Sequence, residues 1–552
     1  NSFCTLLGMG KRKGQPRKTK KVKSKVDAAV AGARALAKGN ASAAAGGEAR
    51  IPDCIKRLSS EAPEEREAAL QDVTHLVLTP SHGALLLSHN AAGLAAGLLA
   101  NDTLAPIRSA AAAALRNIVL SGDESVADGL YPHSAFDLVG GITAALAASI
   151  EEAAQLEQSG PGAETEGGED GEAPSVREQH AAHLTAAYKD VEEFLMLATV
   201  LAESNDAAAQ ALSQWRSNDF MSRLMSCLQC NGHVEVQQAA AECLKVLSED
   251  SEGVASFIGT GLAPEAKTFL NDMVSSAPSS PALLRVSVNM CGALLNVGAS
   301  VSNVQTVLPV LVAAVSTSAG QLLQRLVPLL SNDCALDPAV RQMGVTQGLD
   351  RLRAMQAALQ ALTDALHIVC EEQNDDLDDE AAFASNPAAT VITSSGLLPA
   401  MIERAAEVMA PPTDPILRSV LFEPSESGDV ATLQRVLASV EVGVLSLTSS
   451  FIMLLPVTAF GVLSNVWQLI GTAITSRHDR LNDAVKHSRK LAGLDAADED
   501  DGNDGGVAVS SGTGLLCLPL QLESLAEIAA TVQRKDEAGA TQATAAHVDV
   551  FT

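Results

Sequence analysis

Aromatic residues are scarce in this sequence, and no long run alternates β-branched with polar residues. Only 3% of the 552 residues are aromatic, with two Trp and two Tyr. That is too few for an aromatic-rich β-sandwich or for a surface that stacks nucleic-acid bases. Hydrophobic residues make up 47%, mainly Ala, Leu and Val, which fill closely packed helices. We therefore predict an all-α fold.

The sequence also lacks the short motifs of common catalytic sites. It has no Gly-rich phosphate loop, no HExxH and no GxSxG, the patterns that position phosphates, zinc or a nucleophilic serine. Its 11 His are scattered along the chain. We expect no enzyme, no cofactor, and neither catalytic nor metal-binding residues.

The nine Cys show no regular framework spacing, which indicates a reducing compartment rather than a disulfide-stabilised domain. Cys227 and Cys230 form a CxxC close to His233. Zinc usually needs four ligands, and no second CxxC supplies the rest. We predict that both Cys are small, buried apolar side chains on a helix. A metal or redox site is the alternative.

Basic residues are few except near one end of the chain. The sequence has 38 Lys and Arg against 66 Asp and Glu, a net charge of −28. Residues 11–25 (KRKGQPRKTKKVKSK) hold nine of the basic residues and no acid, so the rest of the chain carries −37. Such a tract is expected to be disordered. The acidic remainder is attracted to basic partners and repelled by phosphate backbones.

Four segments within the predicted helices share a short pattern, in which Leu is followed two residues later by Asn, Thr or Val and then by an aliphatic residue. They are 114–118 (ALRNI), 196–200 (MLATV), 243–247 (CLKVL) and 293–297 (ALLNV). Without the acidic linker, their spacing is near the roughly 40–47 residues of armadillo and HEAT repeats. Such helix pairs stack into a curved rod, so we predict an α-solenoid. Chance similarity among Ala/Leu-rich helices is the alternative.

Charged and Gly-rich segments divide the chain into four predicted regions. These are a disordered basic tail and linker (1–50), armadillo-like repeats (51–300), HEAT-like repeats (301–480), and an acidic linker with a C-terminal helix (481–552). Acidic segments interrupt the repeats at 157–175 and 371–388. Helices are expected over about 52–150, 180–247, 281–297, 338–373, 389–409, 428–476 and 516–535. Pro63 and Pro106 suit first helical turns.

Arg116, Asn117 and Asn296 belong to the shared pattern and are candidate cargo-binding residues of a groove. A side-chain amide both donates and accepts hydrogen bonds, so one Asn can match one peptide unit of an extended partner. Thr199 and Val246 stand at the equivalent positions of the other two segments, so the predicted ladder is incomplete. The alternative for each Asn is a cap on its own turn or a link to the neighbouring repeat.

In these segments the chain resembles the symportin family, also called the HEAT-repeat-containing protein 3 family. The basic start MGKRKGQPRKTK resembles the family's opening, and residues 107–130, with the ALRN core, resemble its first clear repeat. Residues 234–257 and 354–383 are similar to later segments, the last of which joins a long helix to an acidic loop. The order of these blocks agrees from about residue 9 to 480. Residues 480–552 do not resemble the family's C-terminal repeats.

The resemblance implies a nuclear import adaptor and dedicated chaperone that supports ribosome biogenesis. Such proteins carry the two basic large-subunit ribosomal proteins that bind 5S ribosomal RNA. A karyopherin or transportin-type receptor would read the basic tail, here Lys11, Arg12, Lys13, Arg17, Lys18, Lys20, Lys21, Lys23 and Lys25. Transportin signals end in Pro-Tyr, whereas Pro16 is followed by Arg17. A different karyopherin that reads Lys/Arg clusters is therefore the alternative receptor.

The acidic loop is the second candidate cargo-binding element. Its candidate residues are Glu371, Glu372, Asp375, Asp376, Asp378, Asp379 and Glu380. Acidic side chains can cover the RNA-binding surface of a basic protein until RNA displaces them. A solvated loop that only adds solubility is the alternative. We expect a monomer that shuttles between nucleus and cytoplasm, with the nucleolus as a further location, and no specific nucleic-acid binding.

Residues 442–476 carry no charge and include about twenty mostly apolar residues, enough to span a membrane. Ser446, Thr448 and Pro456 interrupt this stretch, so we predict a buried helical pair and no membrane contact. A membrane-associated helical protein remains an alternative. A general armadillo-repeat scaffold with a nuclear or nucleolar targeting tail is the other alternative function.

Overall fold

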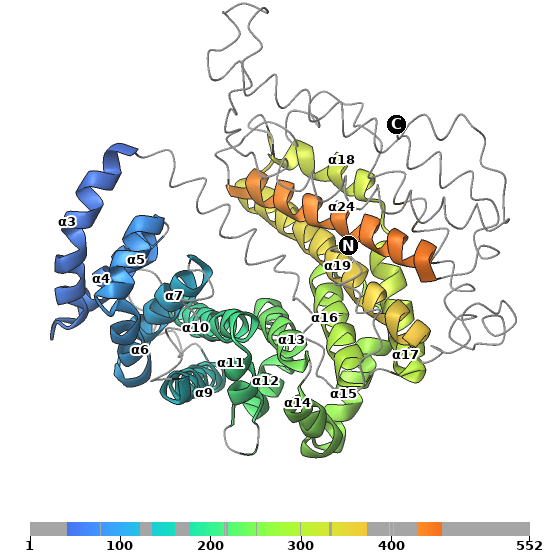
Figure 1. The fold of residues 1–552 in the computed structure, drawn as a ribbon, viewed down its shortest axis with the longest axis horizontal. Coiled ribbons are helices and arrows are strands. Elements are labelled where there is room, and N and C mark those ends of the chain that lie inside the picture. Colours follow the sequence, from blue (N-terminus) through green and yellow to red (C-terminus); the bar gives the residue numbers. More distant parts are fainter. Residues whose placement is uncertain are drawn as a thin grey trace, which may run out of the picture.

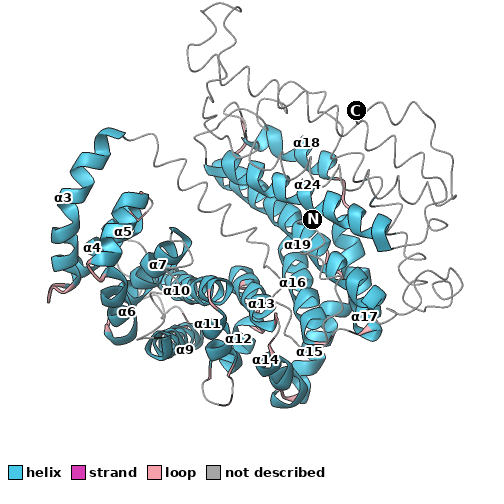
Figure 2. Cartoon of the chain, viewed as in Figure 1, coloured by secondary structure: helices cyan, strands magenta, loops and turns pink. Residues whose placement is uncertain are grey.

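The computed structural model describes residues 41–371 with short gaps, and then residues 428–454. The gaps are 78, 122–134, 161–175, 215, 217–218, 250, 299 and 331–333, and between 372 and 427 only Leu397, Met401 and Arg404 are described. Every element in these ranges is a helix (Figure 2). The all-α prediction is confirmed for this part of the chain.

The helices follow one another through short connections. In chain order they are α3 (Ala41–Leu58), α4 (Pro63–Leu76), α5 (Pro80–Ser88), α6 (Ala91–Asn101), α7 (Ala105–Ser121), α9 (Ala135–Ser159), α10 (Val176–Ser204), α11 (Asp206–Ser213), α12 (Phe220–Leu228), α13 (Val234–Ser248), α14 (Glu252–Ser256), the π-helical turn η1 (Phe257–Gly261), α15 (Pro264–Ser275), α16 (Pro281–Val297), α17 (Val301–Val315), α18 (Ala319–Leu330), α19 (Pro338–Glu371) and α24 (Gly428–Leu454).

Proline and side-chain caps set several of the helix starts. Pro63 and Pro281 occupy the first turns of α4 and α16, where a missing N–H removes no helical hydrogen bond. The side chain of Asn205 caps α11 by accepting a hydrogen bond from the Ala208 N–H at 3.1 Å. Such caps satisfy backbone donors that have no partner within the helix. The predicted starts at Pro63 and Pro281 are therefore confirmed.

Several helices of the described part form a row in which each packs against the next. We call this the central row, and its members are α4, α7, α10, α13, α16, α19 and α24. Figure 1 shows the elements along an arc that begins at α3, passes α14 and α15, and ends at α18 and α24. The central row lies along the inside of that arc, with α9, α14 and α15 on the outside. The four helices with the shared sequence pattern are consecutive members of this row.

The core consists mainly of Ala, Leu and Val side chains. One cluster of buried residues extends from Ile51 to Leu447, and each fully buried Leu contributes about 2 kcal/mol to folding. Small residues bring neighbouring helices close, as at Gly348 of α19, where a Cβ would collide with the Leu326 side chain of α18. The packing of α16 on α17 and α19 carries this core across residue 300, where the two predicted repeat regions meet.

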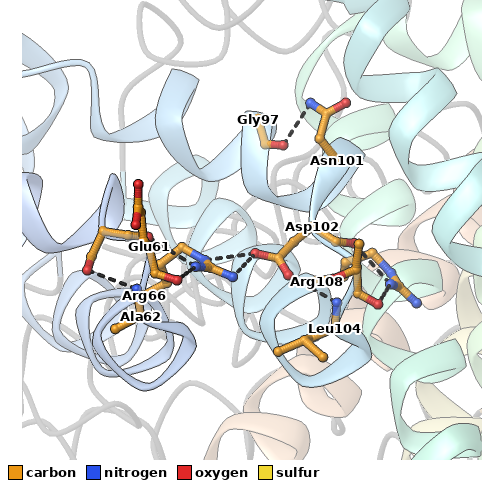
Figure 3. A network of polar contacts seen from close by, with 10 residues as sticks. Glu61, Ala62, Arg66, Gly97, Asn101, Asp102, Leu104 and Arg108 are labelled. Carbon is orange, nitrogen blue, oxygen red and sulfur yellow. Dashed lines mark hydrogen bonds and ion pairs between the residues drawn. The ribbon is translucent and has the colours of Figure 1, made fainter.

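A polar network ties the first helices together at their ends (Figure 3). Arg66 of α4 donates from Nε to Asp102 Oδ2 at 2.8 Å, and its Nη1 donates to the carbonyls of Ser60 and Glu61. The Asp102 side chain is only 4% exposed. Arg108 of α7 donates to the carbonyls of Asp102 and Thr103. These bonds hold the connections before α4 and after α6 in a fixed arrangement.

The later helices bear on two open points of the sequence. The pattern over 338–373 forms one helix, α19, which ends at Glu371. Within the described residues, the segment Gly428–Thr448 of α24 is long and apolar enough to cross a membrane. Two bent helix pairs, His82–Ser88 with Ala91–Asn101 and Ser302–Val315 with Ala319–Leu330, also pass that test if each pair forms one span. About half of the α24 window is buried inside the protein, where α24 packs along α19.

Candidate functional site

Arg116 joins α7 to α10 on the face where these two helices of the central row meet. Its Nη1 lies 2.9 Å from Glu193 Oε2 and 3.1 Å from Met196 Sδ. Both charged side chains are about four-fifths buried. An ion pair that is largely removed from water must keep both partners, because either charge alone is costly to bury. The predicted groove residue Arg116 therefore links two successive helices.

Three carboxyl groups of α10 have a higher pKa than usual. They belong to Asp190, Glu192 and Glu193, and burial is the main cause for each. The neighbouring carboxylates of Glu193 and Glu235 raise the pKa of Glu192 further, while Arg116 and Lys189 oppose the rise. Positive charge brought next to this group would stabilise the ionised carboxylates.

A second ionic network lies further along the central row. Arg285 of α16 donates to Gln238 Oε1 at 2.9 Å and to Glu242 Oε2 at 3.0 Å, both on α13. The same guanidinium lies 3.4 Å from Asp350 Oδ1 of α19. Because the planar guanidinium carries five donors, one side chain holds three successive helices of the row.

The two predicted groove asparagines both bond to the preceding helix of the central row. Asn117 of α7 donates from Nδ2 to the Thr74 carbonyl of α4 at 3.5 Å. Asn296 of α16 donates from Nδ2 to the Lys245 carbonyl at 3.2 Å and to Ser248 Oγ at 3.1 Å, both on α13. The link between neighbours, which the sequence left open, is thus present for each Asn. Their contact with a cargo remains a prediction.

Cys227 and Cys230 lie beside a cluster of polar residues near the end of α9. Tyr188 Oη donates to Glu157 Oε1 at 2.7 Å, and the Tyr188 and His233 rings stack with centroids 3.5 Å apart. Cys227 is buried in α12, as predicted, and burial raises the pKa of its thiol. Cys230 follows the helix and is half-buried, so the prediction of a buried helical residue is wrong for Cys230, where the chain has already turned out of α12. In the described ranges no group of three or more His, Cys, Asp or Glu could hold a metal.

The charged residues predicted to bind partners, in the basic tail and in the acidic loop, lie mostly outside the described residues. The basic residues Lys11 to Lys25 precede α3. Glu371 is the last residue of α19, and Glu372, Asp375, Asp376, Asp378, Asp379 and Glu380 come after it. Of the sequence-predicted site residues, the structure describes the side chains of the groove candidates, and it does not bring all three together, because α10 and α13 lie between α7 and α16 in the central row. Arg116 and Asn117 are on α7, and Asn296 is on α16.

Sequence reasoning missed the acidic residues of α10 and the Arg285 network. Three acids within four residues, Asp190, Glu192 and Glu193, stand directly before the mainly apolar segment 194–202, and this is a signal that could have identified the first. Nothing near Arg285 in the sequence points to Glu242 or Asp350, because these partners are 43 and 65 residues away.

Comparison with known proteins does not assign this chain to a family. No family model matches this chain, and no curated protein matches it. Among solved structures, the crystal structure of an engineered protein is similar, with 15% identity over 88% of this chain and 98% of the other. Its TM-score is 0.33, and we base no conclusion on this likeness.

Proposed function

We propose that this protein is a nuclear import adaptor and dedicated chaperone for the basic large-subunit ribosomal proteins that bind 5S ribosomal RNA. In this proposal the fold is an armadillo/HEAT-repeat α-solenoid. The central row carries the proposal, because successive helices that share a sequence pattern pack on one another in chain order. A stack of this kind provides the long, continuous surface that solenoids use for binding.

The distribution of charge supports a basic cargo. The chain has a net charge of −28 despite its basic tract. The α10 carboxylates are partly desolvated and close to one another, so a Lys or Arg of a cargo would relieve their mutual repulsion. The acidic loop would cover further basic surface, and the tail would remain available to a karyopherin or transportin-type receptor. RNA would release the cargo by competing for the same basic side chains.

The test is a binding measurement between the full chain and basic proteins extracted from large ribosomal subunits. We expect enrichment of the two proteins that bind 5S ribosomal RNA, identified by mass spectrometry. A variant with the seven acids of 371–380 changed to their amides is expected to bind at least tenfold more weakly, because it loses the charges closest to the cargo. No enrichment by the natural chain would refute the proposal.

A matched control separates the acidic loop from net charge alone. The linker 494–506 contains six acids (Asp495, Asp498, Glu499, Asp500, Asp501 and Asp504), and their conversion to amides changes the net charge almost as much. We expect this control to bind cargo like the natural chain. An equal loss in both variants would assign the effect to overall charge and remove the loop from the binding site.

The tail has its own test in cells. Deletion of residues 11–25 is expected to abolish nuclear accumulation while cargo binding persists, because the deletion removes nine basic residues and no acid. A scrambled tail of the same composition is the control, and it distinguishes a receptor that reads a charge cluster from one that reads a fixed order. Unchanged nuclear accumulation after deletion would remove the role assigned to the tail.

The apolar composition of α24 favours a second candidate, a membrane-associated helical protein. Carbonate extraction of cell membranes separates the two candidates, since a spanning chain stays in the pellet and an adaptor enters the supernatant. A general scaffold with a tail that targets RNA is distinguished by a salt titration. RNA binding through the tail would weaken steeply as salt rises.

A further inference from the structure

Three arginines of successive row helices lie close together towards the end of the central row. Arg285 Nη1 of α16 and Arg353 Nη1 of α19 lie 3.4 Å and 3.9 Å from the same oxygen, Asp350 Oδ1. Arg435 of α24 acts on the guanidinium of Arg353. We call Arg285, Arg353 and Arg435 the arginine cluster. It connects α16, α19 and α24, which pack on one another in chain order.

The packing of α24 on α19 explains why Arg435 lies next to Arg353. A Cβ at Gly443 would lie 3.2 Å from Leu359 Cβ, so the missing side chain lets the two helices approach closely. Arg435 precedes Gly443 by eight residues, which is about 12 Å along α24. Arg353 precedes Leu359 by six residues, which is about 9 Å along α19. Two helices that run in the same direction bring both arginines to nearly one level, and Arg435 does act on Arg353.

The arginine cluster holds more positive than negative charge. The carboxylates that act on Arg353 are those of Asp350 and Glu242, so two acids face three arginines. Burial lowers the pKa of the Arg353 guanidinium, and repulsion from Arg285 and Arg435 lowers this pKa further. A carboxylate brought to the cluster would therefore meet positive charge that the protein has not fully neutralised.

The outer two arginines of the cluster are open enough to meet a partner. The Arg353 side chain is 37% exposed, and Arg435 is half-buried. The hydrogen bonds of Arg435 go to uncharged acceptors of its own helix, the Ala431 carbonyl at 3.2 Å and Thr432 Oγ1 at 3.1 Å. The ion pair of Arg353 with Asp350 is long, at 3.9 Å, beyond the range of a direct hydrogen bond. Both guanidinium groups can therefore bind a ligand without giving up a strong partner.

We propose that the arginine cluster binds a short acidic segment of a partner protein. A planar guanidinium matches a carboxylate through two parallel hydrogen bonds. A long phosphate backbone fits less well, because the α10 carboxylates lie two helices before α16 in the row and the chain carries −28 overall, and such charge repels a polyanion. A short segment avoids most of this repulsion, since salt screens charges beyond about 8 Å. The site is separate from the α10 carboxylates, which the proposed function assigns to basic cargo.

Two fluorescent 12-residue peptides test the site, one of alternating Glu and Ala and one of alternating Gln and Ala. The two peptides match in length and shape, and only the first carries negative charge. Fluorescence anisotropy with the full chain is expected to show at least about tenfold tighter binding of the Glu peptide, because charge-assisted hydrogen bonds are stronger than neutral ones. Equal binding of the two peptides, or no binding of the Glu peptide, would overturn the proposal.

Two variants locate the binding on the arginine cluster. Arg435→Gln removes a charge whose hydrogen bonds stay within one helix, so we expect the fold to persist and the Glu peptide to bind about fivefold more weakly. Arg353→Gln is expected to weaken binding by a similar factor. Arg325→Gln is the matched control, because Arg325 is exposed on α18 and its loss changes the net charge equally. An equal loss in the control, or no loss in folded Arg435→Gln, would overturn the proposal.

Two further measurements identify other occupants of the cluster. A 12-nucleotide oligouridine that binds more tightly than the Glu peptide, and loses affinity in Arg353→Gln, would make a phosphate backbone the ligand. A chain that binds the Glu peptide only after the seven acids of 371–380 are changed to their amides would make its own acidic loop the occupant. Either result would overturn the proposal.

Failure of this inference and failure of the proposed function give different results. Enrichment of basic ribosomal proteins without a preference for the Glu peptide would remove the role of the arginine cluster and leave the proposed function in place. A preference that depends on Arg353 and Arg435, in a chain that enriches no basic ribosomal protein, would support the cluster and refute the proposed function.

Discussion

Two arginines tie helices together in different ways at two places along the central row. Arg66 lies at the start of α4 and bonds mainly to connections, namely two backbone carbonyls and the nearly buried Asp102 at the end of α6. Arg285 lies within the row and bonds only to side chains of the two adjacent row helices. Arg66 thus connects the start of α4 to the end of α6, and Arg285 connects the three successive row helices α13, α16 and α19.

The two regions are therefore expected to respond differently to loss of their arginine. Asp102 keeps one bond, from the Leu104 N–H at 3.0 Å, so removing Arg66 leaves a buried carboxylate without a positive partner. Asp350 has a second arginine, since Arg353 Nη1 lies 3.9 Å from its Oδ1. The Arg285 network is therefore redundant where the Arg66 network is not.

The largest effect is expected from Arg66→Met. The substitution keeps much of the packing but leaves the buried Asp102 carboxylate without its positive partner. We expect it to lower the free energy of unfolding by about 3 kcal/mol. Urea denaturation followed by circular dichroism measures the change. The double variant Arg66→Met/Asp102→Leu is expected to recover part of the loss. Equal stability of the single variant and the natural chain would show that Asp102 does not depend on Arg66.

Arg285→Met is expected to cost about 2 kcal/mol under the same conditions, because Glu242 and Gln238 lose a partner while Asp350 keeps Arg353. Combining it with Arg353→Met is expected to exceed the sum of the single losses, since Asp350 then has no positive neighbour. Strictly additive losses would contradict the redundancy described above.

A smaller effect, with a defined pH dependence, is expected for Glu192→Gln. The raised pKa of Glu192 means that the folded protein binds its proton more readily than the unfolded chain. This contribution to stability is greatest below the ordinary pKa of 4.5 and declines as pH rises through the raised pKa. We therefore expect Glu192→Gln to stabilise the protein at pH 7 by less than about 1 kcal/mol.

The same variant should lose its advantage in acid, where the natural carboxyl is already protonated. Urea denaturation at pH 7 and pH 5 measures the difference between the two proteins, which is expected to narrow at pH 5. Glu265→Gln, at an exposed position on α15, controls for the change in net charge. An advantage that grows in acid would mean that the pKa shift has the opposite sign.

The smallest effect is expected for Asn117→Ala. Its bond to the Thr74 carbonyl is long at 3.5 Å, so we expect a loss of only about 0.5 kcal/mol. The equivalent change Asn296→Ala removes two shorter bonds and is expected to cost more. A larger loss for Asn117 would reverse the order that the bond lengths imply.

Sequence patterns predicted many of the helices because their signals are local, but they missed α14, α15, α17 and α18. Pro63 and Pro281 start helices through their own backbone geometry, and the apolar spacing of Ile107, Ala111 and Leu115 places all three in the core. The shared Leu-containing pattern selected α7, α10, α13 and α16, which do pack in succession. These features depend on residues within a few turns of one another.

The polar contacts of the site could not be predicted in the same way. Asn117 and Asn296 were chosen as candidate cargo-binding residues, with a link to the neighbouring repeat as the alternative, and the partners they bond to are backbone and side-chain groups 43 to 51 residues away. Only three-dimensional contacts show which groups these two amides bond to.

The order of contacts in the central row also bears on how the molecule is made. After α4, each helix of the central row packs against a row helix that precedes it in the chain. The surface on which a new helix packs has therefore already been synthesised when that helix leaves the ribosome. Short sequence separation between contacting elements favours rapid assembly. The central row can therefore fold co-translationally from its amino-terminal side, and little of its apolar surface stays exposed until a distant segment is synthesised.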